Sequence, residues 1–390
     1  MNEAWILAGS RTPIGRFLGA FSDLSAPALG GIVIAESLTR AGIAKEAVDE
    51  VIMGNVLSAG VGQAPARQAA LCAGLPDTVA ALTINKVCGS GLKAVMLAAQ
   101  VVRLSEADVV VAGGMENMSR APRLLRGSRS GWKLGDVPLE DALLRDGLWC
   151  SFDDCHMGMH AEYTARTHDV SRTDQDAYAF ESQQRAGKAI EADAFGDEIV
   201  PVSVGETTHA SDEGPRPNTE LSRLAKLAPA FDANGSVTAG NASMLSDGAA
   251  AVVVTNRRLA DSSDARWKAR ILASHTSGGP PRELFTAPVA AIREAVEKAG
   301  LSLEEIDLFE INEAFAAQSV ACLRLLELDG ERVNVHGGAI ALGHPIGASG
   351  ARILVTLLAA LEQRNGRYGV AGLCLGGGNA VAMVVERVRD

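Results

Sequence analysis

The first residue whose surroundings suggest chemistry is Cys88, in the segment NKVCGSGL (residues 85–92). An apolar run with helical spacing follows, so Cys88 is expected where a loop turns into a helix. Free N–H groups and the positive end of the helix dipole would stabilise a thiolate there. A lone cysteine is more often a small buried core residue. A nucleophile at Cys88 therefore also requires a base.

The candidate base is His344, in the glycine-rich segment NVHGGAIALGHPIGASG (residues 334–350). Five glycines between residues 337 and 350 indicate a tightly folded loop that ends at the start of a helix. A histidine that accepts the thiol proton is the ordinary activator of such a cysteine.

Two further segments place polar or reactive residues at the ends of predicted strands. Cys374 ends an apolar run and precedes three glycines, which could form a bulge or direct N–H groups at an oxyanion. Asn312 and Glu313 follow another apolar run in EINEAFAAQ (residues 310–318). Paired polar residues at such a place are more often caps than catalysts.

Alternating strands and helices must position these residues. Continuous apolar runs predict strands that helices cover on both faces, which is typical of the α/β class. The predicted strands lie at 51–56, 108–112, 250–255, 307–311, 370–375 and 380–385, and predicted helices include 92–102 and 351–361.

Composition narrows the function classes. The chain has 390 residues, 41 of them glycine, and a formal net charge of −11, which argues against nucleic-acid binding. Apolar runs stay shorter than a membrane span, and the N-terminus does not have the pattern of a signal peptide. Six cysteines without a CxxC pair argue against a disulfide scaffold. We expect a cytoplasmic protein with free thiols.

An internal repeat is visible at an offset of 258 to 259 residues. The motif around Ala41-Gly42 recurs around Ala299-Gly300, and each copy precedes an apolar run. Ser90-Gly91 likewise recurs as Ser349-Gly350, and Val111-Ala112-Gly113 recurs as Val370-Ala371-Gly372. Three such matches in the same order favour a duplicated α/β half over chance similarity. The duplication would place the Cys88 and His344 loops at equivalent positions, across a shared cleft.

The region between the repeated halves has more charge and more turn signals. It includes an arginine-rich stretch up to Lys133 and a helix start at Ser171 with the pattern of a capping box. We interpret it as an inserted loop domain. The expected domains are residues 1–118 with 247–267, the insertion 119–246, and residues 268–390.

The four motif segments together resemble the thiolase family, and within it the acetyl-CoA acetyltransferase branch. NKVCGSGLKAV, NEAFAAQ, GGAIALGHPIGASGAR and CLGGGNA occur in the order that the family shows, and AGNAS and HMG also match. The resemblance extends from RTPIG (residues 11–15) to the last predicted strand. It implies two duplicated αβα halves that form a five-layered αβαβα core with an inserted loop domain.

The resemblance also implies a reaction: reversible Claisen condensation of two acetyl-CoA molecules to acetoacetyl-CoA and CoA by ping-pong chemistry. Cys88 would carry the acetyl group, His344 would remove its proton, and Cys374 would deprotonate the second substrate. A water held by Asn312 would join His344 in stabilising the enolate. Backbone N–H groups of Cys88 and Gly376 would form a second oxyanion hole.

The same resemblance implies partners and a binding site for coenzyme A, which is a substrate and product rather than a cofactor. We expect no cofactor, metal, nucleic acid or membrane partner, and a homo-oligomer, a tetramer by resemblance with a dimer as the alternative. Fatty acid metabolism is the expected context. The residues that match the family's pantetheine contacts and channel lining are Ser243, Phe231, Met157, Phe315 and His156.

Three departures from the family pattern limit how much the resemblance implies. Ala228 stands where the family often has an arginine near the nucleotide, which puts affinity at that end in doubt. His336 replaces an asparagine, and a structural role is favoured over a second base. Leu284-Phe285 replaces a Met-Gly pair beside the acyl pocket. The acyl chain length, the direction in the cell and the pathway therefore stay open, and a degradative 3-ketoacyl-CoA thiolase is an alternative.

Other interpretations fit parts of these motifs. His156 and His160, with Asp153, Asp154 and Cys155 nearby, suggest a metal site, but HMG already has a place in the family pattern. A catalytically inactive acyl-CoA-binding scaffold would not require Cys88, His344 and Cys374 together. A ketoacyl or hydroxymethylglutaryl synthase would lack Cys374 as a base, and a Cys–His hydrolase would release free acid.

Overall fold

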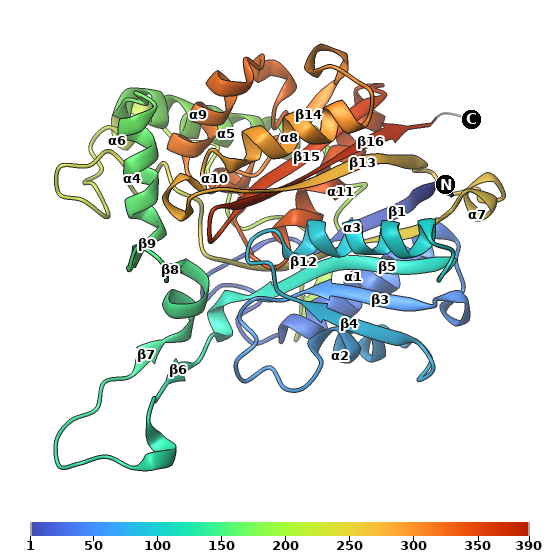
Figure 1. Cartoon of the computed structure of the whole chain (residues 1–390), viewed down its shortest axis with the longest axis horizontal. Coiled ribbons are helices and arrows are strands. Elements are labelled where there is room, and N and C mark those ends of the chain that lie inside the picture. The colour runs from blue at the N-terminus through green and yellow to red at the C-terminus, as the bar shows by residue number, and fades with distance from the viewer. Residues whose placement is uncertain (1, 389–390) are drawn as a thin grey trace.

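A ten-stranded sheet runs through the centre of the protein, whose computed structural model describes residues 2–388 (Figure 1). Its strand order is β14-β15-β16-β13-β1-β12-β5-β3-β4, and β2 pairs with β12 at one side. The strands are β1 (Ala4–Arg11), β2 (Gly15–Arg16), β3 (Glu50–Gly54), β4 (Ala80–Ile84), β5 (Val109–Asn117), β12 (Ser246–Asn256), β13 (Ala269–Gly278), β14 (Leu308–Ile311), β15 (Tyr368–Leu375) and β16 (Asn379–Arg387). All six predicted strands are confirmed, whereas β1, β4 and β13 were missed.

The duplication predicted from the sequence is confirmed by the topology. The order β3-β5-β12-β1 in one half equals β14-β15-β16-β13 in the other, and the parallel and antiparallel pairings also match. Matching irregularities interrupt the register after Ile6 in β1 and after Ile271 in β13. The two halves meet edge to edge where β1 pairs with β13.

Helices cover both faces of each half and produce five layers. In β5, Val110 and Ala112 pack on the central helices α3 and α11, whereas Val109 and Val111 pack on α1 and α2. Strand β5 is therefore apolar on both faces, as its continuous apolar run predicts. The helices of the two halves are α1 (Ala26–Ala41), α2 (Pro65–Cys72), α3 (Ser90–Arg103), α7 (Arg257–Asp261), α8 (Ala287–Lys298), α9 (Ala316–Leu326), α10 (Ala339–Leu342) and α11 (Ser349–Gln363).

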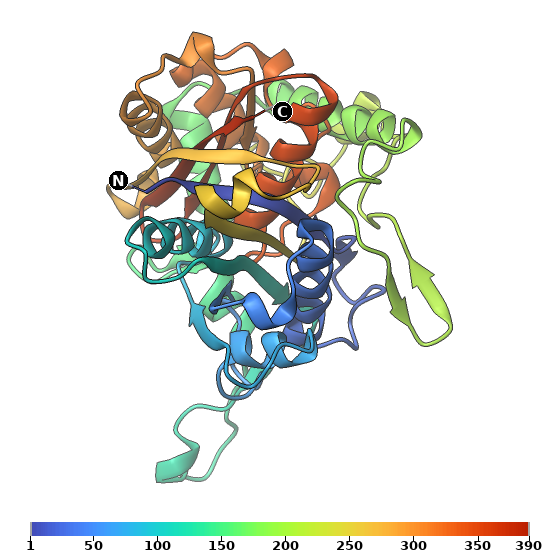
Figure 2. The same ribbon diagram turned by 90° about the vertical axis from the view of Figure 1, so that its right-hand side faces the viewer.

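The inserted region forms a separate layer and an arm. The capping box at Ser171 and Asp174 starts α5, as expected, and Figures 1 and 2 both show the β6–β7 arm extending away from the body. The elements of the insertion are β6 (Arg123–Leu124), β7 (Glu140–Asp141), the π-helical turn η4 (Leu143–Leu148), β8 (Trp149–Cys150), β9 (Cys155–His156), α4 (Met157–Thr167), α5 (Arg172–Glu191), β10 (Val202–Val204), β11 (Thr207–His209) and α6 (Leu221–Leu224).

Short 3-10 turns complete the described secondary structure, and two of them repeat the duplication. Turn η1 (Lys45–Ala47) precedes β3 as η6 (Leu303–Glu305) precedes β14. None of the helices in residues 2–388 is both long and apolar enough to cross a membrane. The remaining turns are η2 (Met118–Arg120), η3 (Ser128–Ser130), η5 (Pro281–Glu283) and η7 (Gly330–Arg332).

Buried ion pairs attach the insertion to the first half. The Arg11 guanidinium donates to both Asp212 carboxylate oxygens at 2.6 and 2.9 Å and to Glu198 at 2.5 Å, and all three side chains are buried. Charge-assisted, bidentate bonds of this kind fix orientation. The insertion is thus held at a defined position against β1.

The two central helices cross at a pair of glycines that the repeat makes equivalent. A Cβ atom on Gly350 would lie 2.4 Å from the backbone nitrogen of Leu92, and one on Gly91 would lie 2.7 Å from that of Ala351. Real Cβ atoms do not approach backbone this closely. The N-termini of α3 and α11 therefore touch only because both positions lack a side chain.

We expect Gly350→Ala to lower the free energy of unfolding by about 1–3 kcal/mol, because the added methyl group would force α3 and α11 apart. Chemical denaturation gives the value. Gly330→Ala is the matched control, since its Cβ would meet only Leu323 at 3.9 Å. A Gly350→Ala protein as stable as the control would contradict the close crossing.

Candidate active site

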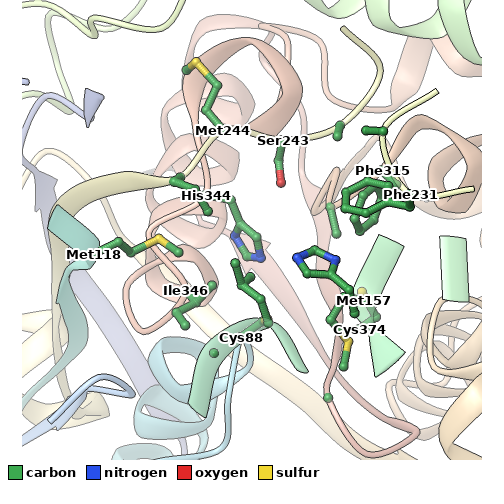
Figure 3. Close-up of a pocket in the computed structure, with 18 of the residues that line it drawn as sticks. Cys88, Met118, Met157, Phe231, Ser243, Met244, Phe315, His344, Ile346 and Cys374 are labelled. Atoms are coloured by element: carbon green, nitrogen blue, oxygen red, sulfur yellow. The ribbon is translucent and has the colours of Figure 1, made fainter. Parts of the chain in front are cut away.

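A cavity of about 570 Å³ opens between the two halves and the insertion (Figure 3). It is lined by all of the site residues expected from the sequence except Asn312, which lies behind His344. These lining residues are Cys88, His344, Cys374, Gly376, Ser243, Phe231, Met157, Phe315 and His156. Residues up to 288 positions apart in the chain are thus brought to one pocket, Cys88 and Gly376 among them.

Cys88 sits on a strained turn directly before α3. Val87 has a φ of 48°, which is rare for a β-branched residue and is typical of functional sites. The Ser90 hydroxyl accepts from the Lys86 N–H at 2.8 Å and donates to the Val87 carbonyl at 2.6 Å, which holds the turn. The cysteine is half-buried and faces the cavity.

Burial dominates the acidity of the Cys88 thiol. It raises the pKa of Cys88 to about 12, and the nearby Glu116 carboxylate adds to the rise. The backbone N–H groups of Cys88 itself and of Gly376 act in the opposite direction and lower this pKa. These two N–H groups are the ones expected from the sequence to form an oxyanion hole, and both reach the sulfur. The free thiol is neutral at physiological pH.

His344 is held rigidly, and its hydrogen bonds define its tautomer. Its backbone N–H donates to the Met244 carbonyl at 3.1 Å. Its Nδ1 lies 2.6 Å from the Ser349 hydroxyl, which itself donates to the Pro345 carbonyl at 2.9 Å. Because that hydroxyl already donates its proton to Pro345, it accepts from Nδ1–H. The Nε2 lone pair is then free to face the pocket.

The imidazole of His344 is a neutral base. Burial lowers its pKa to about 3, with a smaller contribution from Arg352. Asn312 Nδ2 lies 3.5 Å from His344 Nε2, whereas Asn312 Oδ1 is buried and has no hydrogen-bond partner within residues 2–388. Asn312 therefore contacts the site through His344. Its Oδ1 atom remains available to accept a further hydrogen bond.

Cys374 ends β15 and lies beside Cys88, as Figure 3 shows. Burial and then the neighbouring Cys88 and Cys322 thiols raise its pKa well above the usual range. After Cys374 the chain turns through Gly377 and Gly378, whose φ values of 87° and 79° suit glycine. This turn places the Gly376 N–H against Cys88. Both cysteines and the histidine are thus uncharged groups in one buried site.

Aromatic side chains form one wall of the pocket. Phe231 stacks on His156 at 4.7 Å and meets Phe315 edge-on at 6.1 Å. A Cβ on Gly158 would lie 2.2 Å from the Phe231 ring, which explains the glycine of the HMG motif. His156 Nδ1 accepts from the Gly158 N–H at 3.0 Å and caps α4. These rings make this side of the pocket largely apolar.

The departures from the family pattern fall in different places. Leu284 and Phe285 are buried and line the pocket. His336 does not line it and instead packs edge-on against Phe195, and burial lowers its pKa to about 4. The structure thus gives His336 surroundings that fit the structural role favoured from the sequence.

The arginine-rich stretch belongs to the arm. Arg123 pairs with Asp141 and Arg126 pairs with Glu140, and these arginines do not line the pocket. Arg16 and Arg216 do line it. These two arginines were not predicted from the sequence, because neither lies in a recognisable motif.

Two further residues near the site, Ser349 and Glu116, were also missed. The Ser349 hydroxyl orients His344, although the sequence marks it only as a helix start. The buried Glu116 carboxylate accepts from the N–H groups of Val56 and Leu57, at 3.1 Å each, and of Gly347 at 2.9 Å. It ties the two halves together behind Cys88. Burial raises the pKa of Glu116 to about 7, and these N–H groups oppose the rise.

Two adjacent polar residues expected at the site have separate roles. Asn312 contacts His344, whereas the Glu313 carboxylate accepts hydrogen bonds from Ser182, Tyr178 and Asn334 at 2.7, 3.1 and 3.0 Å. Glu313 therefore holds α5 of the insertion against the second half. The ordinary structural interpretation holds for Glu313 but not for Asn312.

Comparison with known proteins identifies the family. Residues 4–258 match the family described as thiolase, N-terminal domain, and residues 265–387 match thiolase, C-terminal domain. The chain belongs to the thiolase family. The relatives of this thiolase include a probable acetyl-CoA acetyltransferase of Escherichia coli K12, 52% identical over 99% of this chain and all of that protein.

Two more comparisons agree in fold and length. An acetyl-CoA acetyltransferase of Pseudomonas aeruginosa is 50% identical over 99% of this chain and 100% of that protein. The crystal structure of the Bacillus anthracis acetyl-CoA acetyltransferase superposes with a TM-score of 0.97 at 41% identity, covering 100% of this chain and 99% of that one. The five-layered thiolase fold predicted from the sequence is confirmed.

The acidities of Cys88 and His344 make a testable prediction about thiol reactivity. A pKa of about 12 at Cys88 leaves the thiol protonated at neutral pH, and His344 stays uncharged above about pH 3. The rate of Cys88 alkylation by iodoacetamide should therefore rise about tenfold per pH unit from about pH 6 to 9, without a plateau. Mass spectrometry of the Cys88 peptide measures this rate.

Cys88→Ser is the control. Alkylation that remains in this variant occurs at other thiols, such as the exposed Cys72, and gives the background rate. A plateau near neutral pH in the Cys88 rate would contradict the prediction. It would mean that a thiolate–imidazolium ion pair forms in the free enzyme.

Proposed function

We propose that this thiolase condenses two acetyl-CoA molecules to acetoacetyl-CoA and CoA, and catalyses the reverse thiolysis. The observation that carries the proposal is the convergence of Cys88, His344 and Cys374 on one pocket. A nucleophilic thiol, a neutral base and a second thiol are the groups that acyl transfer and carbon deprotonation require. The names of the full-length relatives support the acetyl-CoA substrate.

In the proposed first half-reaction, the Cys88 sulfur attacks the thioester carbonyl carbon of acetyl-CoA. The thiol proton passes to His344 Nε2, and the negative charge moves to the carbonyl oxygen, near the N–H groups of Cys88 and Gly376. The C–S bond to CoA then breaks, and His344 returns its proton to the leaving CoA sulfur. Acetyl-Cys88 and free CoA result.

In the proposed second half-reaction, the Cys374 thiol passes its proton to His344 Nε2, and the resulting thiolate takes a proton from the methyl group of another acetyl-CoA. His344, which lines the pocket with Cys88, and Asn312, which contacts His344 at 3.5 Å, are suited to stabilise the enolate oxygen. The enolate carbon attacks the Cys88 thioester, a carbon–carbon bond forms, and the Cys88 sulfur leaves. His344 returns the proton that it holds to the departing Cys88 sulfur, and acetoacetyl-CoA is released.

The CoA arm is proposed to lie along the aromatic wall. Phe231, Met157 and Phe315 offer apolar contacts to the pantetheine, and Ser243 offers a hydroxyl at the same wall. Arg16 and Arg216 carry positive charge into the lining of this pocket and would suit the phosphates.

Several expectations remain proposals. We infer a homo-oligomer, a tetramer by resemblance with a dimer as the alternative, and the exposed Trp132 and Leu134 of the arm support such a contact. A cytoplasmic enzyme of fatty acid metabolism that needs no cofactor or metal for its chemistry, and binds neither nucleic acid nor membrane, is the proposed setting. The proposed domains remain residues 1–118 with 247–267, 119–246 and 268–390.

Separate half-reactions test the assigned roles. Cys88→Ser and His344→Ala should reduce acetyl exchange between acetyl-CoA and CoA at least about a thousandfold, because acylation requires both groups. Cys374→Ala should still form acetyl-Cys88, detected by mass spectrometry, yet fail in condensation. Cys72→Ser, at an exposed thiol, is the control. Equal loss of both half-reactions in Cys374→Ala would show that the roles are misassigned.

Acyl chain length is proposed to be limited by Phe285. This buried ring meets Phe315 edge-on at 5.2 Å, in the apolar cluster that also contains Cys374. Such a cluster leaves little room beyond the reacting carbon. The proposed preference is therefore for acetoacetyl-CoA over longer 3-ketoacyl-CoA.

Thiolysis of acetoacetyl-CoA beside C6–C10 3-ketoacyl-CoA measures this preference. Phe285→Ala should raise kcat/KM for the C6 substrate relative to acetoacetyl-CoA by about tenfold or more, since each methylene is worth about 1–3 kcal/mol. Leu325→Ala, exposed on α9, should leave the ratio unchanged. A wild-type enzyme that prefers C8–C10 substrates would favour the degradative alternative. Absence of any thiolysis would favour the catalytically inactive scaffold.

A further inference from the structure

A second group of reactive side chains gathers behind the β8–β9 hairpin. One donor atom from each of Cys150, Asp153 and His160 lies within 4.8 Å of the others. None of the three lines the catalytic pocket, and the proposed reaction uses none of them. The structure separates the two histidines that the sequence suggested as a pair. His156 faces Phe231, whereas His160 faces this group.

Both ring nitrogens of His160 remain available to bind a metal ion. Its side chain is only 4% exposed, and neither ring nitrogen has a hydrogen-bond partner in the described part of the chain. Nε2 lies 3.1 Å from the Asp153 Oδ2 atom, a contact that falls outside hydrogen-bond geometry. Burying a polar ring without partners is costly. A cation between these two side chains would remove that cost.

One sulfur donor, Cys150, lies in the cluster with His160, and Cys155 stands next to it on the hairpin without being part of the cluster. Cys150 is buried and pairs across the hairpin with Cys155, so both thiols belong to neighbouring positions of one short ribbon. The Asp153 N–H donates to the Cys150 sulfur at 3.4 Å, as backbone groups do around metal-bound thiolates. Asp153 Oδ1 faces Arg282 at 3.8 Å, which leaves Oδ2 for the cluster.

We propose that Cys150, Asp153 and His160, with Cys155 as the fourth donor, form a structural site for one Zn²⁺ ion. Two sulfurs, an imidazole and a carboxylate suit the tetrahedral preference of zinc better than that of magnesium or calcium. The spacing C-x4-C-x4-H places all four donors within eleven residues. From the sequence a metal was disfavoured because no second ligand pair with a known spacing was visible and HMG already had a place in the family pattern. Cys150 joins the candidate ligands through the pairing of the hairpin strands.

The site would stabilise one wall of the catalytic pocket. The hairpin leads directly into His156 and Met157, which line that pocket. A metal that joins β8, β9 and α4 would fix their relative positions without touching a substrate. The proposal does not depend on the reaction assigned to Cys88.

Metal titration tests the site directly on the whole protein. The purified, reduced protein is stripped with a chelator and titrated with Zn²⁺ against a chromophoric chelator, and with Co²⁺ in parallel. We expect one equivalent of Zn²⁺ per chain, and a Co²⁺ spectrum with thiolate charge-transfer and tetrahedral ligand-field bands.

Variants identify the ligands. Cys150→Ser should abolish the charge-transfer intensity from that sulfur and weaken Zn²⁺ binding at least about a hundredfold. Asp153→Asn, at a partly exposed side chain, provides a second test if His160→Ala does not fold. Cys72→Ser and Cys88→Ser should bind Zn²⁺ like the wild type, which excludes the exposed and the catalytic thiols.

Three results would overturn the proposal. They are binding of less than about a tenth of an equivalent of Zn²⁺, an unchanged Co²⁺ spectrum in Cys150→Ser, and a Cys150–Cys155 disulfide whose reduction leaves no metal affinity. The last would make the hairpin a redox pair instead. None of these results bears on acetyl transfer, so the site can fail while the proposed function stands.

Discussion

The architecture depends on the contact between α3 and α11 at Gly91 and Gly350. Two helix N-termini can meet backbone to backbone only where neither has a side chain, and every layer outside them is stacked on this crossing. The loops that enter these helices carry Cys88 and His344. The close contact of the two helices thus sets the distance between the Cys88 and His344 loops. Glycine at positions 91 and 350 is therefore a structural requirement of the chemistry.

Burial of the site from solvent determines the protonation states of its reactive groups. Burial raises the pKa of Cys88 and Cys374 and lowers that of His344, so charge separation between them is unfavourable in the free protein. Proton transfer has to accompany bond formation, when the N–H groups of Cys88 and Gly376 can meet a developing negative charge. The Ser349 hydroxyl contributes by holding Nδ1 of His344, which leaves the Nε2 lone pair as the basic position of the ring.

The sequence predicted those parts of the protein that local patterns encode. Continuous apolar runs identified the strands, and the repeat anticipated the matched strand order of the two halves. Strands β1, β4 and β13 were missed. Alternating burial weakens the apolar signal of β13, the apolar run of β1 breaks at Gly9 and Ser10, and β4 is partly exposed. Glu116 and Arg216 were also missed, because their roles arise from contacts between distant segments. The part that Cys150 plays beside His160 was missed for another reason, since it depends on the local pairing of β8 with β9. Ser349 was visible as a helix start, yet its bond to His344 required the fold of the loop.

Because β1 and β13 join the two halves edge to edge within one chain, the two halves can carry different catalytic residues. A dimer of two identical halves would have to present the same residue on both sides of its axis. Joining the halves in one polypeptide removes that restriction. Asn85 occupies the place in the first half that His344 occupies in the second, so one copy could specialise in carrying the acyl group while the other specialised in moving protons.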